Sequence, residues 1–234
     1  MSMGVVYALL VSQALAAPPS DLVSQVQAAW QATNSYCADF VFAVHGNKNM
    51  AVSKGRTCME PAKRVLTETE SPLGPVVDIR MKGEAWYYDP ARPVVVHFIS
   101  EQGAVAPGEG LGEWVEMLAN TGSYTPLEDI LIDGRLHWRV SYVLEESGDE
   151  VVLMIDREHR LPTAMELRKD GAPLLSNGYV KLAVNPVIPD SYFQIRALVN
   201  APTVEVQWDP NRAPSEVAAE VEAPSAPSGK RRGR

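Results

Sequence analysis

The sequence lacks the short motifs that usually mark an enzyme. It has no G-x-S-x-G, no H-E-x-x-H and no P-loop. The glycine-rich stretch Gly108-Glu109-Gly110-Leu111-Gly112 has no strand-helix-strand pattern around it, so we interpret it as a hinge. The four histidines, His45, His97, His137 and His159, are far apart in the chain. We therefore expect no catalysis and no metal or organic cofactor, with a hydrolase built from residues distant in sequence as the competing class.

Clustered positive charge is also lacking in the central part of the chain. The net charge is −8, and no stripe of Lys and Arg interrupts the region expected to fold. Because affinity for phosphate backbones depends on such clusters, a general nucleic-acid binder is excluded. With 234 residues, 46% of them hydrophobic, the chain can bury one sizeable core, and we expect one domain at residues 18–199.

No long apolar run is present at the N-terminus. The run at residues 5–11 is far shorter than the roughly 20 residues that span a bilayer. Ala14 and Ala16 fit a signal-peptidase site, so residues 1–17 are predicted to be a signal peptide, with export to the periplasm as a soluble protein. No Lys or Arg precedes the run, which a start codon placed too far downstream would explain. The alternative is a buried N-terminal segment.

The composition changes after about residue 200. Five prolines alternate with Ala, Glu, Ser and Val, and a basic end follows. We predict that residues 200–234 form a disordered tail. Its basic residues could contact an anionic membrane weakly, whereas the alternative is a solubilising end without a partner. These basic residues are Lys230, Arg231, Arg232 and Arg234.

Alternation of apolar and polar residues dominates the central region and predicts antiparallel strands. Lys82-Gly83, Asp133-Gly134 and Asp170-Gly171 have the composition of tight hairpin turns. A turn at Lys82-Gly83 places Val77 opposite Tyr88 and, two residues on, Ile79 opposite Trp86. The strand after Asp133-Gly134 presents an apolar face that needs a cover or a ligand. That face consists of Leu136, Trp138, Val140, Tyr142 and Leu144.

The two cysteines are placed to pair across a hairpin. If Asn47-Lys48 is a two-residue turn, or residues 46–49 are a four-residue loop, facing residues have numbers that sum to 95, and Cys37 faces Cys58. The same register sets Asp39 opposite Arg56, a favourable pair of charges. At a non-hydrogen-bonded site the Cα atoms lie about 4.5 Å apart, within disulfide range. We expect a disulfide and an oxidising compartment; two unpaired core thiols are the alternative, because a change of one residue in the turn separates them.

Only two helices are indicated. The first follows Ser20 or Asp21 as N-cap and carries Leu22, Val26 and Trp30 at helical spacing. The second covers about residues 111–118, where one apolar stripe recurs at i, i+3, i+4 and i+7. We expect both stripes to close over an apolar sheet face, either as ordinary core or as the wall of a ligand cavity.

The order of these signals resembles the LolA-like periplasmic lipoprotein carriers over roughly residues 21–198. In the first half the resemblance rests on the aromatic strand at residues 39–42, the Gly55-Arg56 strand and the stretch at residues 82–90. In the second half it rests on Leu153-Met154-Ile155-Asp156 followed by Leu161-Pro162, the Asp170-Gly171 turn, and the motifs Asn185-Pro186 and Ile188-Pro189-Asp190-Ser191-Tyr192-Phe193.

This resemblance implies an α+β fold: a curved, incompletely closed antiparallel β half-barrel covered by short helices. It implies a carrier that shields the acyl chains of a lipoprotein or other lipid in a hydrophobic cavity during transfer between envelope membranes. Its partners would be an inner-membrane donor complex and an outer-membrane acceptor. A sensor of envelope lipids or lipoproteins with the same fold is the alternative. The residues expected to line the cavity are Phe40, Phe42, Ile79, Trp86, Tyr88, Trp114, Leu118 and Trp138.

One position departs from the family pattern. Carriers of this kind commonly have Arg-Pro after the second strand, where the Arg ties the sheet to the lid, but this chain has Glu60-Pro61. Lys63 or Arg64 could substitute only if the backbone shifts. The family's latch between sheet and lid is therefore not expected in its usual form.

Overall fold

The computed structural model describes residues 17–46, 49–99, 110–207 and 212–221, and these form one twelve-stranded sheet. Its order is β12-β6-β5-β4-β3-β2-β1-β11-β10-β9-β8-β7. The strands are β1 (Tyr36–His45), β2 (Met50–Glu60), β3 (Arg64–Thr69), β4 (Val76–Met81), β5 (Glu84–Asp89), β6 (Arg92–Ile99), β7 (Thr125–Ile132), β8 (Arg135–Val143), β9 (Glu150–Asp156), β10 (Pro162–Lys169), β11 (Ala172–Val184) and β12 (Thr203–Gln207). The helices are α1 (Leu22–Gln31), α2 (Leu111–Asn120), η1 (Asp190–Phe193), α3 (Ile195–Leu198) and α4 (Pro214–Glu220).

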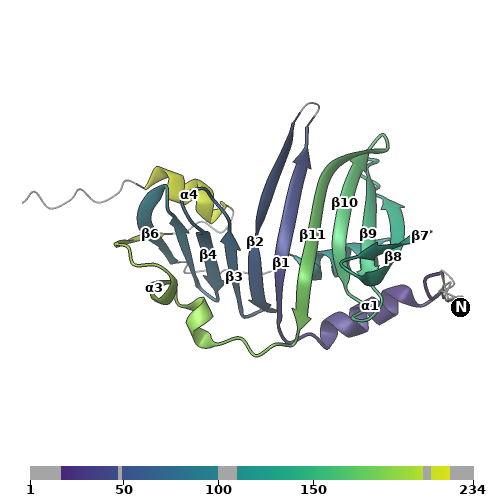
Figure 1. Cartoon of the computed structure of the whole chain (residues 1–234), viewed down its shortest axis with the longest axis horizontal. Coiled ribbons are helices and arrows are strands. Elements are labelled where there is room, and N and C mark those ends of the chain that lie inside the picture. The colour runs from purple at the N-terminus through teal and green to yellow at the C-terminus, as the bar shows by residue number, and fades with distance from the viewer. Residues whose placement is uncertain (1–16, 47–48, 100–109, 208–211, 222–234) are drawn as a thin grey trace, which may run out of the picture.

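The sheet is open. Every neighbouring pair is antiparallel except β12 with β6, which is parallel. β6 and β7 lie at opposite ends of the molecule, and β1 and β2 extend as a long hairpin beyond β3 (Figure 1). The predicted α+β half-barrel is confirmed. No helix among the described residues is long and apolar enough to cross a membrane.

Tight turns set the strand registers. Asp133 and Gly134 have φ values of 48° and 77°, and Asp170 and Gly171 have 51° and 77°, as hairpin turns with two left-handed residues require. The predicted pairs Val77 with Tyr88 and Ile79 with Trp86 are present. Residues 47–48, the predicted β1–β2 turn, lie outside the described part of the chain, but the register that this turn implied is observed over the whole of β1.

The two faces of the sheet carry separate cores. Side chains alternate between the faces along each strand. The helix face carries Tyr36, Met59 and Leu153, which pack with the apolar stripes of α1 and α2. Both predicted stripes are confirmed: Leu22 and Val26 of α1 are buried, as are the four stripe residues of α2. The reverse face carries Cys58 and Ile79, covered by the η1–α3 segment.

The structure differs from the predicted disordered tail at two segments. β12 extends the sheet beside β6, and α4 packs on the helix face of β5 and β6. Val204 and Val206 alternate with polar residues, a strand pattern that the proline-rich composition concealed. Without this cover, Val94, Val96 and Phe98 would expose an apolar face, and its burial is the driving force for docking. The basic end, residues 230–234, lies outside the described residues.

Candidate functional site

A pocket lies on the helix face between α2 and strands β1, β2, β3 and β11. Its volume is about 300 Å³, at the low end of the roughly 300–1,000 Å³ usual for small-molecule sites. Its apolar walls come from neighbouring strands and the lid helix, so sheet and helix must stay together to form it. The lining residues are Tyr36, Phe40, Phe42, Thr57, Met59, Val65, Thr67, Gly110, Glu113, Trp114, Asn177 and Tyr179.

A pair of tyrosines joins the lid to the sheet. Tyr36 of β1 and Tyr179 of β11 meet edge to face, with ring centroids 6.3 Å apart. Burial, followed by the neighbouring Tyr179, raises the pKa of Tyr36 far above its ordinary value, although a hydrogen bond from the backbone N–H of Leu111 opposes the shift. Gly110 allows this approach: a Cβ there would lie 2.7 Å from the Tyr36 hydroxyl, and its φ of 97° suits glycine. The N-terminus of α2 is thus tied to the sheet.

Phe40 owes its position to the glycine opposite it. Phe40 of β1 pairs with Gly55 of β2, and a Cβ on Gly55 would lie 2.6 Å from the end of the Phe40 ring. The absence of a side chain at Gly55 lets the ring lie over the strand, where it forms part of the pocket wall. Phe42 lies two residues further on the same face.

The pocket is not purely apolar. Thr57 donates a hydrogen bond to the carbonyl oxygen of Leu66 at 3.2 Å and lies 3.5 Å from the Thr67 hydroxyl. The Oδ1 atom of Asn177 is buried in the wall, and no group among the described residues donates to it. Glu113 of α2 is exposed and contributes the carboxylate of the lining. The site therefore combines hydrocarbon walls with hydrogen-bond acceptors.

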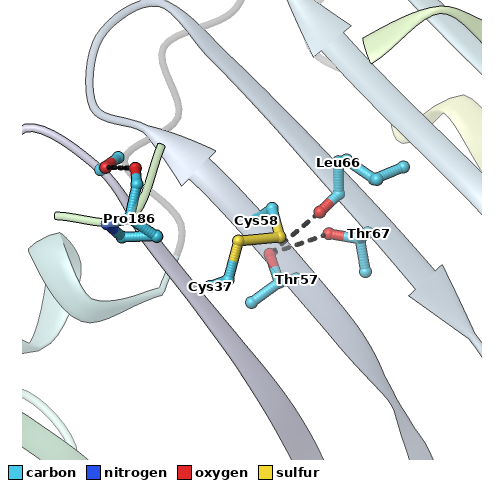
Figure 2. The surroundings of a disulfide bond; sticks show 7 residues. Cys37, Thr57, Cys58, Leu66, Thr67 and Pro186 are labelled. Atoms are coloured by element: carbon cyan, nitrogen blue, oxygen red, sulfur yellow. Dashed lines mark hydrogen bonds between the residues drawn. A yellow bond between two sulfur atoms is a disulfide. The ribbon is translucent and has the colours of Figure 1, made fainter. Parts of the chain in front are cut away.

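The disulfide lies directly behind this wall. Cys37 and Cys58 are bonded as predicted, with Cα atoms 4.1 Å apart. Figure 2 shows them beside Thr57, whose hydrogen bonds reach the next strand. Because Tyr36 and Met59 are the adjacent residues in sequence, they point to the pocket side. One covalent bond thus fixes the spacing of two strands that form the pocket.

The structure divides the residues predicted to line a single cavity. Phe40, Phe42 and Trp114 meet in the pocket. Leu118 and Trp138 are in the same helix-face core, outside the pocket lining. In contrast, the residues predicted from β4 and β5 lie on the reverse face, in the core beneath η1 and α3, and cannot share this chamber. These are Ile79, Trp86 and Tyr88. Their ligand-binding role stays untested.

Several pocket residues were not foreseen from the sequence. Thr57, Thr67, Asn177 and Tyr179 are part of strands with a polar alternating pattern, and such strands are normally solvated on one face. A signal for the location was nevertheless present. The register that placed Tyr36 and Phe40 on one face of β1 also placed Thr57 opposite Ala38 on that face.

Arg64 connects the sheet to the C-terminal extension. Its guanidinium lies 2.8 Å from both Glu60 and Asp190, and 4.2 Å above the Phe193 ring. Hydrogen bonds to these carboxylates raise the pKa of Arg64 despite some opposition from burial. Arg64 therefore ties η1 to β3 on the reverse face. It lies three residues after Pro61, where this chain has Glu60-Pro61 in place of the family's Arg-Pro.

Other polar clusters are explained by structural roles. Asp156 accepts hydrogen bonds from the backbone of Glu158 and His159 and from Arg135, which closes the β9–β10 turn. One oxygen of Asp156 lies close to a carboxylate oxygen of Glu158 and a ring nitrogen of His159, a group of atoms that could hold a metal ion. The oxygens of Asp156 already accept the hydrogen bonds described above, however. His45 Nε2 lies 2.9 Å from Ser176 Oγ, and within the described chain no carboxylate is placed to orient this histidine.

A second, larger cavity of about 450 Å³ involves β1, β2 and the end of β3. Its lining includes the charged residues Asp39, Lys54, Arg56, Glu68 and Glu70. Charged walls disfavour a hydrocarbon chain, which gains nothing from them and blocks their hydration. The smaller pocket under α2 is therefore the better candidate for an apolar ligand.

The described residues thus form an open half-barrel with a helix-capped, partly apolar pocket. No protein-family model matches this chain, and no curated protein matches it either. Among solved structures, an uncharacterized conserved protein from Thermus thermophilus is similar at 11% identity and a TM-score of 0.49, over 80% of this chain and 98% of that one.

Two further similar structures have names that indicate a fold family or a partner. A LolA superfamily protein from Nitrosomonas europaea is 12% identical, with a TM-score of 0.37 over 76% of this chain and 98% of that one. The MucA/MucB complex structure from Pseudomonas aeruginosa is 15% identical, with a TM-score of 0.48 over 79% of this chain and 63% of that one. One of these similar structures is named for the LolA superfamily, and the fold of this chain is described by its own strand order.

Proposed function

We propose that this chain is a periplasmic binding protein that shields the acyl chain of a lipid or lipoprotein and carries it between envelope membranes. The pocket under α2 is the observation that carries the proposal. Phe40, Phe42 and Trp114 offer it an apolar lining on a rigid sheet. The Cys37–Cys58 disulfide supports an oxidising compartment, where such bonds persist.

The volume of the pocket indicates how loading would occur. Each Å² of apolar surface removed from water contributes about 25 cal/mol, so enclosing a long chain is strongly favourable. About 300 Å³ is small for such a ligand, however. α2 must therefore move outward to admit it. Apart from the hydrogen bond of Leu111 to Tyr36 at its N-terminus, the helix rests on the sheet through apolar side chains, so its C-terminal part can move outward while that bond is kept.

Native mass spectrometry of the full chain, released gently from the periplasm of an expressing cell, tests binding. We expect lipid adducts on the wild type and their loss from Phe42→Glu, because a carboxylate in the pocket wall would lose its hydration when hydrocarbon binds. Val143→Glu is the matched control, since Val143 is 61% exposed and lies outside the pocket. Wild-type protein free of lipid, or adducts that persist equally in Phe42→Glu, would contradict the proposal.

Transfer between vesicles tests the carrier role itself. Donor vesicles containing a fluorescent acylated peptide are mixed with acceptor vesicles and purified protein. A carrier accelerates the appearance of the peptide in the acceptors, and Phe42→Glu abolishes the acceleration. Tight binding without delivery would instead favour the sensor alternative, in which lipid changes the affinity for a protein partner.

A further inference from the structure

The polar part of the pocket contains information about the head group of the ligand. An enclosure for hydrocarbon alone needs no acceptors in its wall, yet Asn177 Oδ1 is buried there without a donor among the described residues. An unpaired buried acceptor is unfavourable relative to a paired one, because it has lost its hydrogen bonds to water. A ligand with an N–H or O–H group near its acyl chain would satisfy this atom.

The neighbouring polar groups do not fill this need. The Thr57 hydroxyl donates to the carbonyl oxygen of Leu66, and the Tyr36 hydroxyl is engaged with Tyr179 and the backbone of Leu111. Asn177 lies opposite Phe42 in the β1–β11 pairing, so its side chain shares the helix face with that ring. The unmet acceptor is therefore next to the apolar wall, where the polar end of a bound acyl group would meet it.

The charge of the pocket excludes one kind of head group. Glu113 is the charged residue of the described lining. Asp78 and Arg80 of β4 form an ion pair with each other at 2.8 Å and are not part of that lining. The N-terminus of a helix attracts anions, but Glu113 is in the first turn of α2 and offsets that attraction. The Leu111 N–H already donates to Tyr36. A carboxylate ligand would thus meet repulsion and an acceptor, with no cation among the described lining residues to pair with.

From these contacts we infer that the pocket selects uncharged amphiphiles whose acyl chain is linked to a hydrogen-bond donor, such as an amide or hydroxyl, and discriminates against free fatty acids. Asn177 accepts the hydrogen bond and Glu113 excludes the anion. This inference rests on the proposed lipid-binding function and adds the chemical class of the ligand to it.

Calorimetric titration with three ligands of equal chain length tests the inference. N-lauroylethanolamine is uncharged and has hydrogen-bond donors. Methyl laurate is uncharged and has no hydrogen-bond donor, and laurate is an anion at pH 8. We expect wild-type protein to bind N-lauroylethanolamine about tenfold more tightly than the other two, as one paired buried acceptor would give.

Two variants separate the contributions. Asn177→Leu should remove the preference for N-lauroylethanolamine over methyl laurate. Glu113→Gln should strengthen laurate binding about threefold, a modest effect because the carboxylate is exposed, and leave methyl laurate unchanged. Glu116→Gln, an exposed acidic position on α2 outside the pocket lining, is the control and should alter none of the three affinities.

The outcomes distinguish this inference from the function on which it rests. Equal affinities for the three ligands, or a preference that survives in Asn177→Leu, would overturn the head-group selectivity and leave acyl binding in place. Failure of all three ligands to bind would instead remove the lipid-binding function itself.

Discussion

At the scale of single residues, two asparagines on β11 and just after it show the difference between a group that serves the fold and one that does not. Asn185 accepts a hydrogen bond from the backbone of Asn34 at 2.6 Å and donates to the carbonyl oxygen of Ala32 at 3.2 Å. It thereby fixes the end of α1 to the end of β11. Asn177 has an unpaired Oδ1 in the pocket wall. A polar group kept at a cost to the fold is a common sign of a binding site.

Replacing each asparagine by leucine should change stability in opposite directions. Asn177→Leu removes an unpaired buried acceptor and should raise the free energy of unfolding by about 1 kcal/mol. Asn185→Leu breaks two exposed hydrogen bonds and places leucine at a φ of 55°, so it should lower the free energy of unfolding by about 1–2 kcal/mol. Urea denaturation of both variants measures this. Destabilisation of Asn177→Leu similar to that of Asn185→Leu would mean that Asn177 is structural.

At the scale of elements, the strand pairing within a hairpin could be predicted from the sequence. Which side chains of two different hairpins share a face of the sheet could not. The turns at Lys82-Gly83 and Asp133-Gly134 fix their own registers, which is why the pairing of Val77 with Tyr88 was correct. Whether Phe40 and Ile79 share a face depends on β3 and on the connection at residues 70–75. A turn at Ser71-Pro72-Leu73-Gly74 lies there, but in a six-residue connection it does not fix the register as a two-residue turn does, and a shift of one residue moves every side chain to the other face.

The β1–β2 hairpin should depend strongly on its cross-link. Removing the bond in a Cys37→Ala, Cys58→Ala double variant frees a loop with a sequence separation of 21 residues. We expect the free energy of unfolding to fall by about 3 kcal/mol in the chain-entropy model. Guanidinium denaturation compares the variant with the oxidised wild type, and reduced wild type is the matched control. An unchanged midpoint would show that strand pairing alone holds the hairpin.

At the scale of the whole molecule, the residue patterns predicted antiparallel strands with two covering helices, and the family resemblance added the open sheet, but neither indicated the docking of the C-terminal extension. Alternation and turn residues are local signals, and they specified most strands. Packing of β12 and α4 depends instead on an apolar face at β5 and β6 that no local pattern connects to residues 203–220. The unpaired polar atom in the pocket was unpredictable for the same reason, since pairing depends on every neighbour.

Acidification should weaken the fold through the buried end of β8. Burial lowers the pKa of His137 below its ordinary value, although its Nδ1–H donates to the Arg135 carbonyl oxygen at 2.9 Å and partly opposes this. Because the unfolded chain binds the proton more readily, this contribution to stability is complete above about pH 6.5 and is lost as the pH falls through the folded-state pKa.

Asp156, opposite His137, adds a second loss at lower pH. Burial alone would raise its pKa, but hydrogen bonds from the backbone of His159 and Glu158 and from Arg135 lower it on balance. Its contribution is therefore complete above about pH 4 and is lost below. Urea midpoints at pH 8 and pH 5.5 should differ for wild type and for His45→Gln, and less for His137→Gln. An equal difference in all three proteins would rule out His137 as the cause.

The position of the disulfide behind the pocket has a consequence for biogenesis. In a reducing compartment β1 and β2 would lack the covalent bond between them. The spacing of Tyr36 and Met59, which adjoin the cysteines, would then no longer be fixed by that bond. If the chain binds lipid as proposed, its affinity should therefore depend on whether these two thiols are oxidised.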